Sequence, residues 1–333
     1  HYPCCGSMST YIHTADMETR QTIRQLIHDG AARLESAGLV FGHGTDNALD
    51  ESATLVLHAL ELPFDVTDEQ LDTVPSVRQA GRVDTLLEQR ISSRKPAAYL
   101  TGEAWFAGLP FYVDERVLVP RSPIAELIEE GFSPWVDQGG IAHILDLCTG
   151  SGCIGIASAL AFPDARVDLA DLSTDALEVA RRNIRRHALD SRVRAIESDL
   201  FGNLGDNRYD LIVSNPPYVA DEEVRRLPEE YRHEPALGLS AGDDGLDLVI
   251  RLLNAAPAHL GPGGMLVVEV GYSQPALESA FPEIPFLWLE FAYGGEGVFL
   301  LEREQLVEYH FVFEQAARQR QQVSIDSEVR TDE

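Results

Sequence analysis

The sequence predicts an α/β fold with a mostly parallel sheet, preceded by a small helical domain and a β-hairpin. The first observation is a series of five strand-like runs: Ile141–Leu147, Arg166–Asp171, Arg192–Glu197, Tyr209–Ser214 and Met265–Val270. Helical segments such as Asp175–Ala188 separate these runs, and this alternation is typical of a parallel sheet covered on both faces. The second observation is the glycine-rich loop that follows the first run. Two further runs, Phe286–Phe291 and Val298–Glu302, lie close together and predict an antiparallel pair at the end of the sheet.

Length and charge limit the possible functions. A chain of 333 residues is expected to hold about two domains at ~150 residues each, and its 44% hydrophobic content is sufficient for globular cores. The 54 acidic and 26 basic residues give a net charge of −28. This charge opposes a large contact with nucleic acid phosphates and attracts a basic protein partner. Solubility alone is the alternative explanation for the acidic surface.

We expect neither a membrane helix nor a secretion signal. No stretch approaches the roughly 18 consecutive apolar residues of a membrane helix, and no signal peptide is evident. Residues 1–15 include Cys4, Cys5 and Met8, and we expect them to be residues added for expression and a disordered start. Cys148 and Cys153 remain, which are too few for a disulfide framework or a zinc site. We therefore expect a cytoplasmic protein without a bound metal.

Residues 16–96 are expected to form a helical domain. Apolar residues recur at helical spacing in three stripes, within Ile23–Leu34, Leu55–Leu60 and Val83–Ile91. Asp46 is expected to cap the second helix and Pro63 to end it. The stripes indicate an ordinary core, and such a domain without chemistry of its own commonly selects the substrate.

Three further segments follow the helical domain. Residues 97–120 are rich in aromatic and β-branched side chains around Gly102, Gly108 and Pro110, which predicts a β-hairpin that links the two domains. Residues 121–303 hold the alternating strands and helices. Residues 304–333 are polar and rich in Gln, Arg and Glu, and we expect a frayed helix followed by a disordered tail.

The glycine-rich loop indicates a cofactor site. Gly150, Gly152 and Gly155 have the spacing of a dinucleotide-binding loop, and Asp171 stands 21 residues after Gly150, where a ribose-binding carboxylate belongs. This pattern alone favours NAD and S-adenosylmethionine about equally. A dehydrogenase is therefore a genuine alternative.

Asp146 shifts the balance toward S-adenosylmethionine. It lies at the end of the first strand, where a carboxylate favours the cationic amino-acid part of that cofactor and repels a pyrophosphate. Asp171 can bind both ribose hydroxyls, while Asp199 and Leu200 offer adenine a polar group and an apolar face. Asp199 alone is explained equally well as a helix cap. The predicted cofactor-binding residues are Asp146, Leu147, Cys148, Thr149, Gly150, Gly152, Asp171, Asp199, Leu200 and Asn215.

The predicted catalytic residues are Asn215, Pro216, Pro217 and Tyr218, which follow the fourth strand. A pair of prolines cannot continue a strand, so Asn215 is delivered to the sheet edge at which α/β proteins bind ligands. The Asn215 carbonyl oxygen and a nearby main-chain carbonyl converge beside an aromatic ring and suit a planar group with an NH₂, such as an amide or an exocyclic amine. The alternative is a strand that ends in an Asn turn.

Together, these motifs resemble those of the HemK-type protein-(glutamine-N5) methyltransferases. The resemblance rests on Asp146-x-x-x-Gly150-x-Gly152, Asp171, Asn215-Pro216-Pro217-Tyr218 and the preceding helical domain, and covers residues from about 20 to 303. It implies a seven-stranded, Rossmann-like class I methyltransferase sheet in residues 121–303 and S-adenosylmethionine as cofactor. It also implies that Asn215 and Pro216 hold a target amide. His233 could accept the released proton, although it is equally a loop histidine in a structural pair.

Two subgroups of this family modify either peptide release factors or ribosomal protein three of the large subunit (uL3). The segments Tyr112–Ile124 and Tyr231–Pro235 resemble the second subgroup, and the Pro-Glu-Thr-Glu typical of the first is missing after Arg121. The resemblance therefore implies methylation of a glutamine side-chain amide in a basic ribosomal protein, without nucleic-acid specificity. The alternatives are a release-factor methyltransferase, an N6-adenine methyltransferase and a ribosome-assembly factor without activity.

Overall fold

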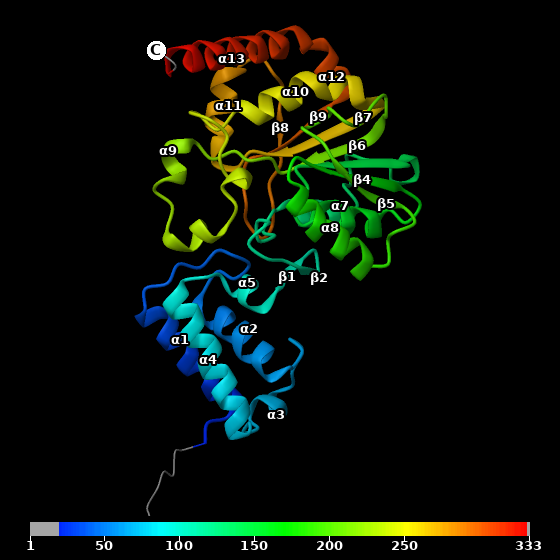
Figure 1. Ribbon diagram of the computed structural model, residues 1–333. Coiled ribbons are helices and arrows are strands. Elements are labelled where there is room, and N and C mark those ends of the chain that lie inside the picture. Colours follow the sequence, from blue (N-terminus) through cyan, green and yellow to red (C-terminus); the bar gives the residue numbers. More distant parts are fainter. Residues whose placement is uncertain (1–19, 332–333) are drawn as a thin grey trace, which may run out of the picture.

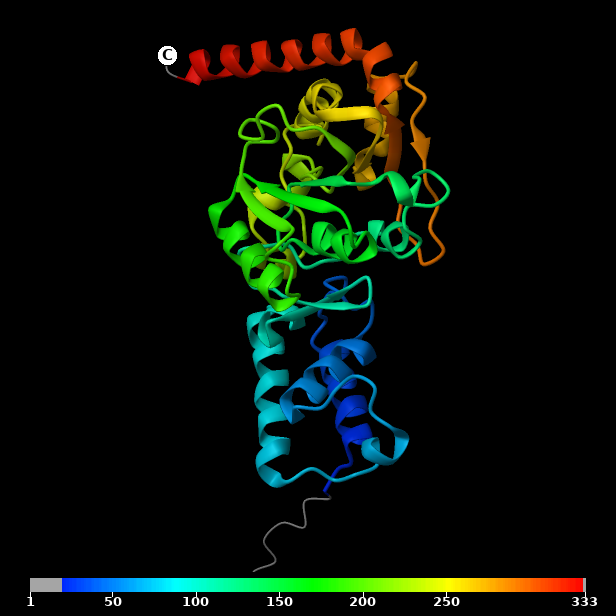
Figure 2. The ribbon, with the colours of Figure 1, turned by 90° about the vertical axis from the view of Figure 1, so that its right-hand side faces the viewer.

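The computed structural model describes residues 20–331, so the predicted start, residues 1–15, lies outside the described residues. Figure 1 shows a helical region at one end of the molecule, a sheet covered by helices in the other half, and a long last helix at the far end. The view in Figure 2 shows the β-hairpin between the helical region and the sheet. Among the described residues, no helix is long and apolar enough to cross a membrane.

The helical region contains the predicted stripes. Its helices are α1 (Ile23–Ser36), α2 (Ala48–Leu60), α3 (Asp68–Leu71), α4 (Val77–Ser93) and α5 (Ala97–Thr101). Leu34, Leu55 and Leu87 are completely or almost completely buried in one shared core. The prediction that Asp46 caps the second helix is wrong. The cap is Asn47, whose side chain accepts a hydrogen bond from the Asp50 N–H, because an Asn at this position reaches the first turn as well as an Asp does.

The predicted hairpin is shorter than residues 97–120. Strands β1 (Glu103–Phe106) and β2 (Leu109–Tyr112) pair antiparallel around a turn at Ala107 and Gly108. Both turn residues have positive φ, as a tight two-residue hairpin requires. The chain then leaves the hairpin, and residues 115–123 line the cavity described below as the candidate active site.

The seven-stranded Rossmann-like sheet that the resemblance implies is confirmed. Its strand order is β5-β4-β3-β6-β7-β9-β8, in which the first five strands are parallel and β9 runs antiparallel to its two neighbours. The strands are β3 (His143–Leu147), β4 (Arg166–Asp171), β5 (Val193–Glu197), β6 (Tyr209–Ser214), β7 (Leu260–Glu269), β8 (Leu287–Trp288) and β9 (Val298–Glu302). Each overlaps one of the seven predicted runs, and the end of the sheet is antiparallel as expected.

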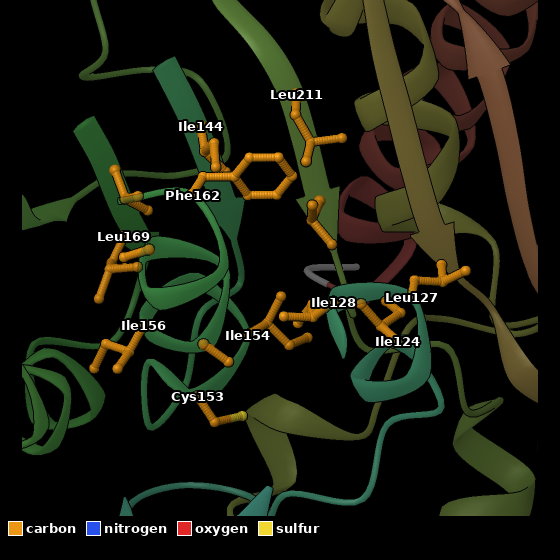
Figure 3. Packing of buried hydrophobic residues seen from close by; sticks show 14 of the residues in the cluster. Ile124, Leu127, Ile128, Ile144, Cys153, Ile154, Ile156, Phe162, Leu169 and Leu211 are labelled. Carbon is orange, nitrogen blue, oxygen red and sulfur yellow. The ribbon is translucent and has the colours of Figure 1, made fainter. Parts of the chain in front are cut away.

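Helices cover both faces of the sheet (Figure 1). One face packs against α6 (Ile124–Glu129), α7 (Cys153–Ala161) and α8 (Thr174–Arg186). Figure 3 shows this core, with Ile128 of α6 beside Ile154 of α7, and Leu211 of β6 near Phe162. The other face packs against α10 (Asp247–His259), α11 (Gln274–Ala280), α12 (Arg303–Glu308) and α13 (His310–Thr331). The carboxyl ends of β3, β4, β6 and β7 lead into residues that line one cavity.

A helix is present beyond Arg303 as predicted, but the expectation that this helix is frayed is wrong for the part that packs on this second face. Leu306 and Phe313 are fully buried, Ala317 is nearly so, and the rings of Phe313 and Phe281 lie 5.4 Å apart. Phe313 and Ala317 are four positions apart, which places them on one side of α13, and Leu306 belongs to the separate helix α12. The polar composition describes the outward side of the same helices.

The remaining short elements lie in the connections. They are α9 (Asp221–Val224), η1 (Gln138–Gly140), η2 (Glu229–His233), η3 (Ala236–Gly238) and η4 (Gly271–Ser273). Three of them, α9, η2 and η3, belong to the loop between β6 and α10, which we call the motif loop (residues 221–247). Figure 1 shows this loop extending from the sheet toward the helical region.

Candidate active site

A cavity of about 1190 Å³ lies at the carboxyl ends of the parallel strands. Its wall contains ten of the predicted site residues: Cys148, Thr149, Gly150, Asp171, Asp199, Leu200, Asn215, Pro216, Pro217 and Tyr218. The segment after the hairpin and the motif loop complete the wall. The two predicted halves of the site, cofactor loop and Asn-Pro-Pro-Tyr motif, thus open into the same space.

Three predicted cofactor residues lie behind the wall. Leu147 is fully buried, and its carbonyl accepts a hydrogen bond from the Ser214 hydroxyl, which ties β3 to β6. Gly152 begins α7 with a φ of 82°, and a Cβ at this position would lie 3.1 Å from a Leu169 methyl. It therefore allows the close approach of helix and strand. Asp146 is the third of these residues.

Asp146 is buried behind the glycine-rich loop and holds that loop in place. It does not line the cavity, so the prediction that it lies against the cofactor is not met. One carboxylate oxygen accepts the Thr149 hydroxyl and the Gly155 N–H, the latter at 2.9 Å. These two donors hold the side chain beneath the loop, where it is buried. Burial raises the pKa of Asp146 to about 7, since the charged form loses most of its hydration.

Asp171 has the geometry expected of a ribose-binding carboxylate. It ends β4 and lines the cavity. One oxygen accepts the Gly150 N–H at 2.9 Å and the other accepts the Ser173 N–H at 2.8 Å. Each oxygen keeps a further lone pair for a hydroxyl donor. Burial raises the pKa of Asp171 above its usual range, against the effect of these amides.

Asp199 and Leu200 follow β5 closely, at the same edge of the sheet. Both line the cavity, and Asp199 forms an ion pair with Arg251 at 2.7 Å. The alternative role of Asp199 as a helix cap is wrong, because a turn follows this residue and no helix of the described chain begins there. Leu200 adopts a positive φ of 47°, which is an unusual backbone conformation for a bulky residue.

The Asn-Pro-Pro-Tyr motif leaves β6 and turns across the cavity. Asn215 and Tyr218 are half-buried, and both prolines are buried. The Tyr218 hydroxyl donates to a Glu269 oxygen at 3.1 Å, and the Tyr218 carbonyl accepts the Ser273 hydroxyl at 2.6 Å. Burial raises the pKa of Tyr218, so its hydroxyl is a hydrogen-bond donor at neutral pH. These contacts hold the motif at Tyr218, and the Ser214 hydroxyl, which donates to the Leu147 carbonyl, holds the strand end just before Asn215.

Glu269 and Arg121 are site residues that the sequence reasoning did not select. Glu269 ends β7, is buried and lines the cavity. Arg121 also lines the cavity and binds the buried Glu234 of the motif loop through both terminal nitrogens. The available signal for Glu269 was an acid inside the apolar run Met265–Val270, at the same sheet edge as Asn215.

His233 is a structural residue. Its two ring nitrogens lie 2.9 Å from the Ser93 carbonyl oxygen and 3.3 Å from a Glu115 oxygen, and it does not line the cavity. The possibility that it accepts the released proton is therefore not supported by its position. It instead joins the motif loop to the end of α4.

Comparison with known proteins gives consistent matches. Residues 136–229 match the family model described as "Methyltransferase small domain". A protein of Bordetella pertussis named ribosomal protein uL3 glutamine methyltransferase is 50% identical over 287 residues, or 86% of this chain and 96% of that relative. A Xylella fastidiosa protein of the same name is 50% identical over 310 residues, or 91% of this chain and 97% of that relative. A methyltransferase structure from Pyrococcus furiosus is 22% identical and covers 59% of this chain and 89% of that chain, with a TM-score of 0.43.

Proposed function

Because the chain belongs to the ribosomal protein uL3 glutamine methyltransferase family, we propose that it methylates one glutamine side-chain amide, at N5, in ribosomal protein uL3. It is a methyltransferase, and S-adenosylmethionine is its methyl donor. The single observation that carries the proposed chemistry is the shared cavity. Asp171 at the end of β4 and Asn215 directly after β6 both line this cavity, on either side of β3.

The cofactor half fits S-adenosylmethionine. Asp171 offers two carboxylate oxygens, each already oriented by a backbone amide, to the two ribose hydroxyls. Asp199 and Leu200 would flank the adenine, and the loop from Cys148 to Gly150 would border the amino-acid part. Asp146 would act on that part only through the loop that it fixes. The bound donor supplies an electrophilic methyl group on a sulfonium.

The substrate half fits an amide. An amide nitrogen is a poor nucleophile because its lone pair is delocalised into the carbonyl. Acceptance of its two hydrogens by the Asn215 side-chain oxygen and the Pro216 carbonyl favours a pyramidal nitrogen with a more available lone pair. Tyr218 would limit the position of the amide plane. Positioning and electrostatics supply the rate enhancement, and the proton leaves after methyl transfer.

The chemistry of the site also bears on the alternatives. An N6-adenine methyltransferase would use the same acceptors, but a net charge of −28 opposes the phosphate contacts that dominate nucleic-acid binding. The same charge favours a basic protein substrate. Family membership favours uL3 over release factors and methyl transfer over hydride transfer.

Ribosomal proteins are made in the cytoplasm, which is also where the free thiols of Cys148 and Cys153 would remain reduced.

Substitution of Asn215 tests the proposed chemistry against an assembly factor without activity. Asn215→Ala should retain the fold and most cofactor affinity but lose at least roughly tenfold in kcat, because its acceptor matters most as the nitrogen pyramidalises. Calorimetry with S-adenosylmethionine and single-turnover kinetics on uL3 separate binding from transfer. A uL3 variant with Glu at the target position is the matched control and should receive no methyl group, because a carboxylate offers the two acceptors no hydrogens. Equal transfer rates for Asn215→Ala and the unchanged enzyme would show that the motif only ends the strand and does not act in methyl transfer.

A further inference from the structure

Glu269 is a buried carboxylate at the reacting end of the cavity, and the methyl transfer described above does not use it directly. In the parallel register of β6 and β7, Ser214 lies beside Val268. The next residue of each strand is Asn215 on one side and Glu269 on the other. Both therefore reach the carboxyl edge together, and both line the cavity.

The Glu269 carboxylate is surrounded by donors. The Ser122 hydroxyl donates to one oxygen at 2.5 Å, and the Tyr218 hydroxyl donates to the other at 3.1 Å. The guanidinium of Arg121 adds a favourable charge, while burial acts in the opposite direction and raises the pKa of Glu269. These contacts join the segment after the hairpin, the Asn-Pro-Pro-Tyr motif and β7 at one side chain.

Asn215 belongs to the same set of groups. It follows the strand next to β7 and lines the cavity with Glu269, and its side chain acts to lower the pKa of that carboxyl, which an amide does by donating an N–H to the charged form. An ionised carboxylate only accepts hydrogen bonds. A hydrogen bond between these two side chains therefore uses the Asn215 NH₂, and it leaves the Asn215 carbonyl oxygen for another partner.

We infer that Glu269 is a positioning residue for the methyl transfer: it accepts the Asn215 side-chain N–H and thereby directs the Asn215 carbonyl oxygen to the substrate amide. An asparagine side chain has two orientations that differ only by exchange of O and NH₂. In the wrong orientation, an NH₂ would face the NH₂ of the target glutamine. Glu269 accepts only from the correct orientation, and it holds Tyr218 against the same site. This inference rests on the proposed function.

Glu269→Gln is the sharpest test because it preserves shape while adding a donor. The Gln NH₂ can bind the Asn215 oxygen and stabilise the wrong orientation. We expect kcat on uL3 to fall roughly tenfold or more, as for loss of a hydrogen bond to a charged group, with unchanged affinity for S-adenosylmethionine. The unchanged enzyme should also lose activity as falling pH protonates Glu269, and this acidic limb should disappear in the variant. Glu269→Asp keeps the acceptor and should recover part of the lost rate.

Asp168→Asn is the matched control. Asp168 is also a nearly buried strand carboxylate that accepts a tyrosine hydroxyl, that of Tyr209 at 2.8 Å, but it does not line the cavity. This variant should keep the pH profile of the unchanged enzyme. The inference would be overturned if Glu269→Gln kept the kcat of the unchanged enzyme and the same loss of activity at low pH. It would also be overturned if Asp168→Asn lost as much kcat as Glu269→Gln.

A spectroscopic measurement tests the inference without turnover. In the free enzyme labelled with ¹⁵N-asparagine, the side-chain NH₂ resonances of Asn215, assigned by their loss in Asn215→Ala, should shift with pH as Glu269 ionises. They should not show this titration in Glu269→Gln. A titration that persists in the variant would overturn the inference. If the enzyme failed to methylate uL3 while the resonances titrated as expected, the proposed function alone would be rejected.

Discussion

At the scale of single residues, Asp146 is expected to make stability fall as pH rises. Its pKa is about 7 in the folded state and roughly 3.9 in an unfolded chain. Between these values the folded state holds a proton that the unfolded state has released. The stabilising contribution is therefore fully present below about pH 4 and is lost as pH approaches 7, by an amount on the order of 4 kcal/mol.

Asp146→Asn removes this titration and should give a flatter pH dependence. Denaturant unfolding of both proteins between about pH 4 and 8 gives the free energies of unfolding, and the difference between variant and wild type should increase over that range. His43, whose pKa burial lowers to about 4, acts in the opposite direction between about pH 4 and 6.5. It is present in both proteins, so its effect cancels in the difference. A difference that does not depend on pH would mean that Asp146 is ionised throughout.

At the scale of elements, the packing of α13 on the sheet domain leads to a paired prediction. Phe313 is fully buried and Phe311 is 66% exposed on the same helix. Phe313→Ala should lower the free energy of unfolding by about 3–5 kcal/mol, because it leaves a cavity beside Phe281. Phe311→Ala should change it by less than about 0.5 kcal/mol. If both substitutions changed the free energy of unfolding equally little in denaturant unfolding, α13 would not belong to the cooperative core.

The same elements show what the sequence can predict. The seven strands were located because each is an apolar run bounded by polar or turn residues, which is a local signal. Burial of Phe313 depends on α10 and α11 and has only a weak local signal within a polar segment. The inward turn of Asp146 was missed for a similar reason, since the sequence shows a carboxylate beside glycines but not which donors it reaches.

The motif loop shows the same limit for charge. It contains nine acids and three arginines, which in the sequence suggest a strongly acidic rim. In the structure, arginines from distant parts of the chain neutralise several of these acids. Arg94 pairs with Glu229 and Glu230, Arg121 with Glu234, and Arg320 with Asp244 and Asp247. The loop is therefore tied to both domains and contributes less free negative charge than its composition indicates.

At the scale of the whole molecule, the net charge of −28 should accelerate association with a basic protein. We expect kcat/KM on intact uL3 to fall with added salt, mainly through a slower association rate, because salt screens long-range attraction. A short neutral peptide that contains the target glutamine is the control and should show little dependence on salt. A kcat/KM on intact uL3 that is constant across ionic strength would exclude electrostatic steering.

Methylation of uL3 itself tests the central claim most directly. Unmethylated uL3, incubated with the enzyme and isotopically labelled S-adenosylmethionine, should acquire one labelled methyl group, and mass mapping should place it on a glutamine side chain. Unmethylated release factor incubated in parallel should remain unlabelled. Label on another residue type of uL3, label only on the release factor, or no label on either protein would contradict the account.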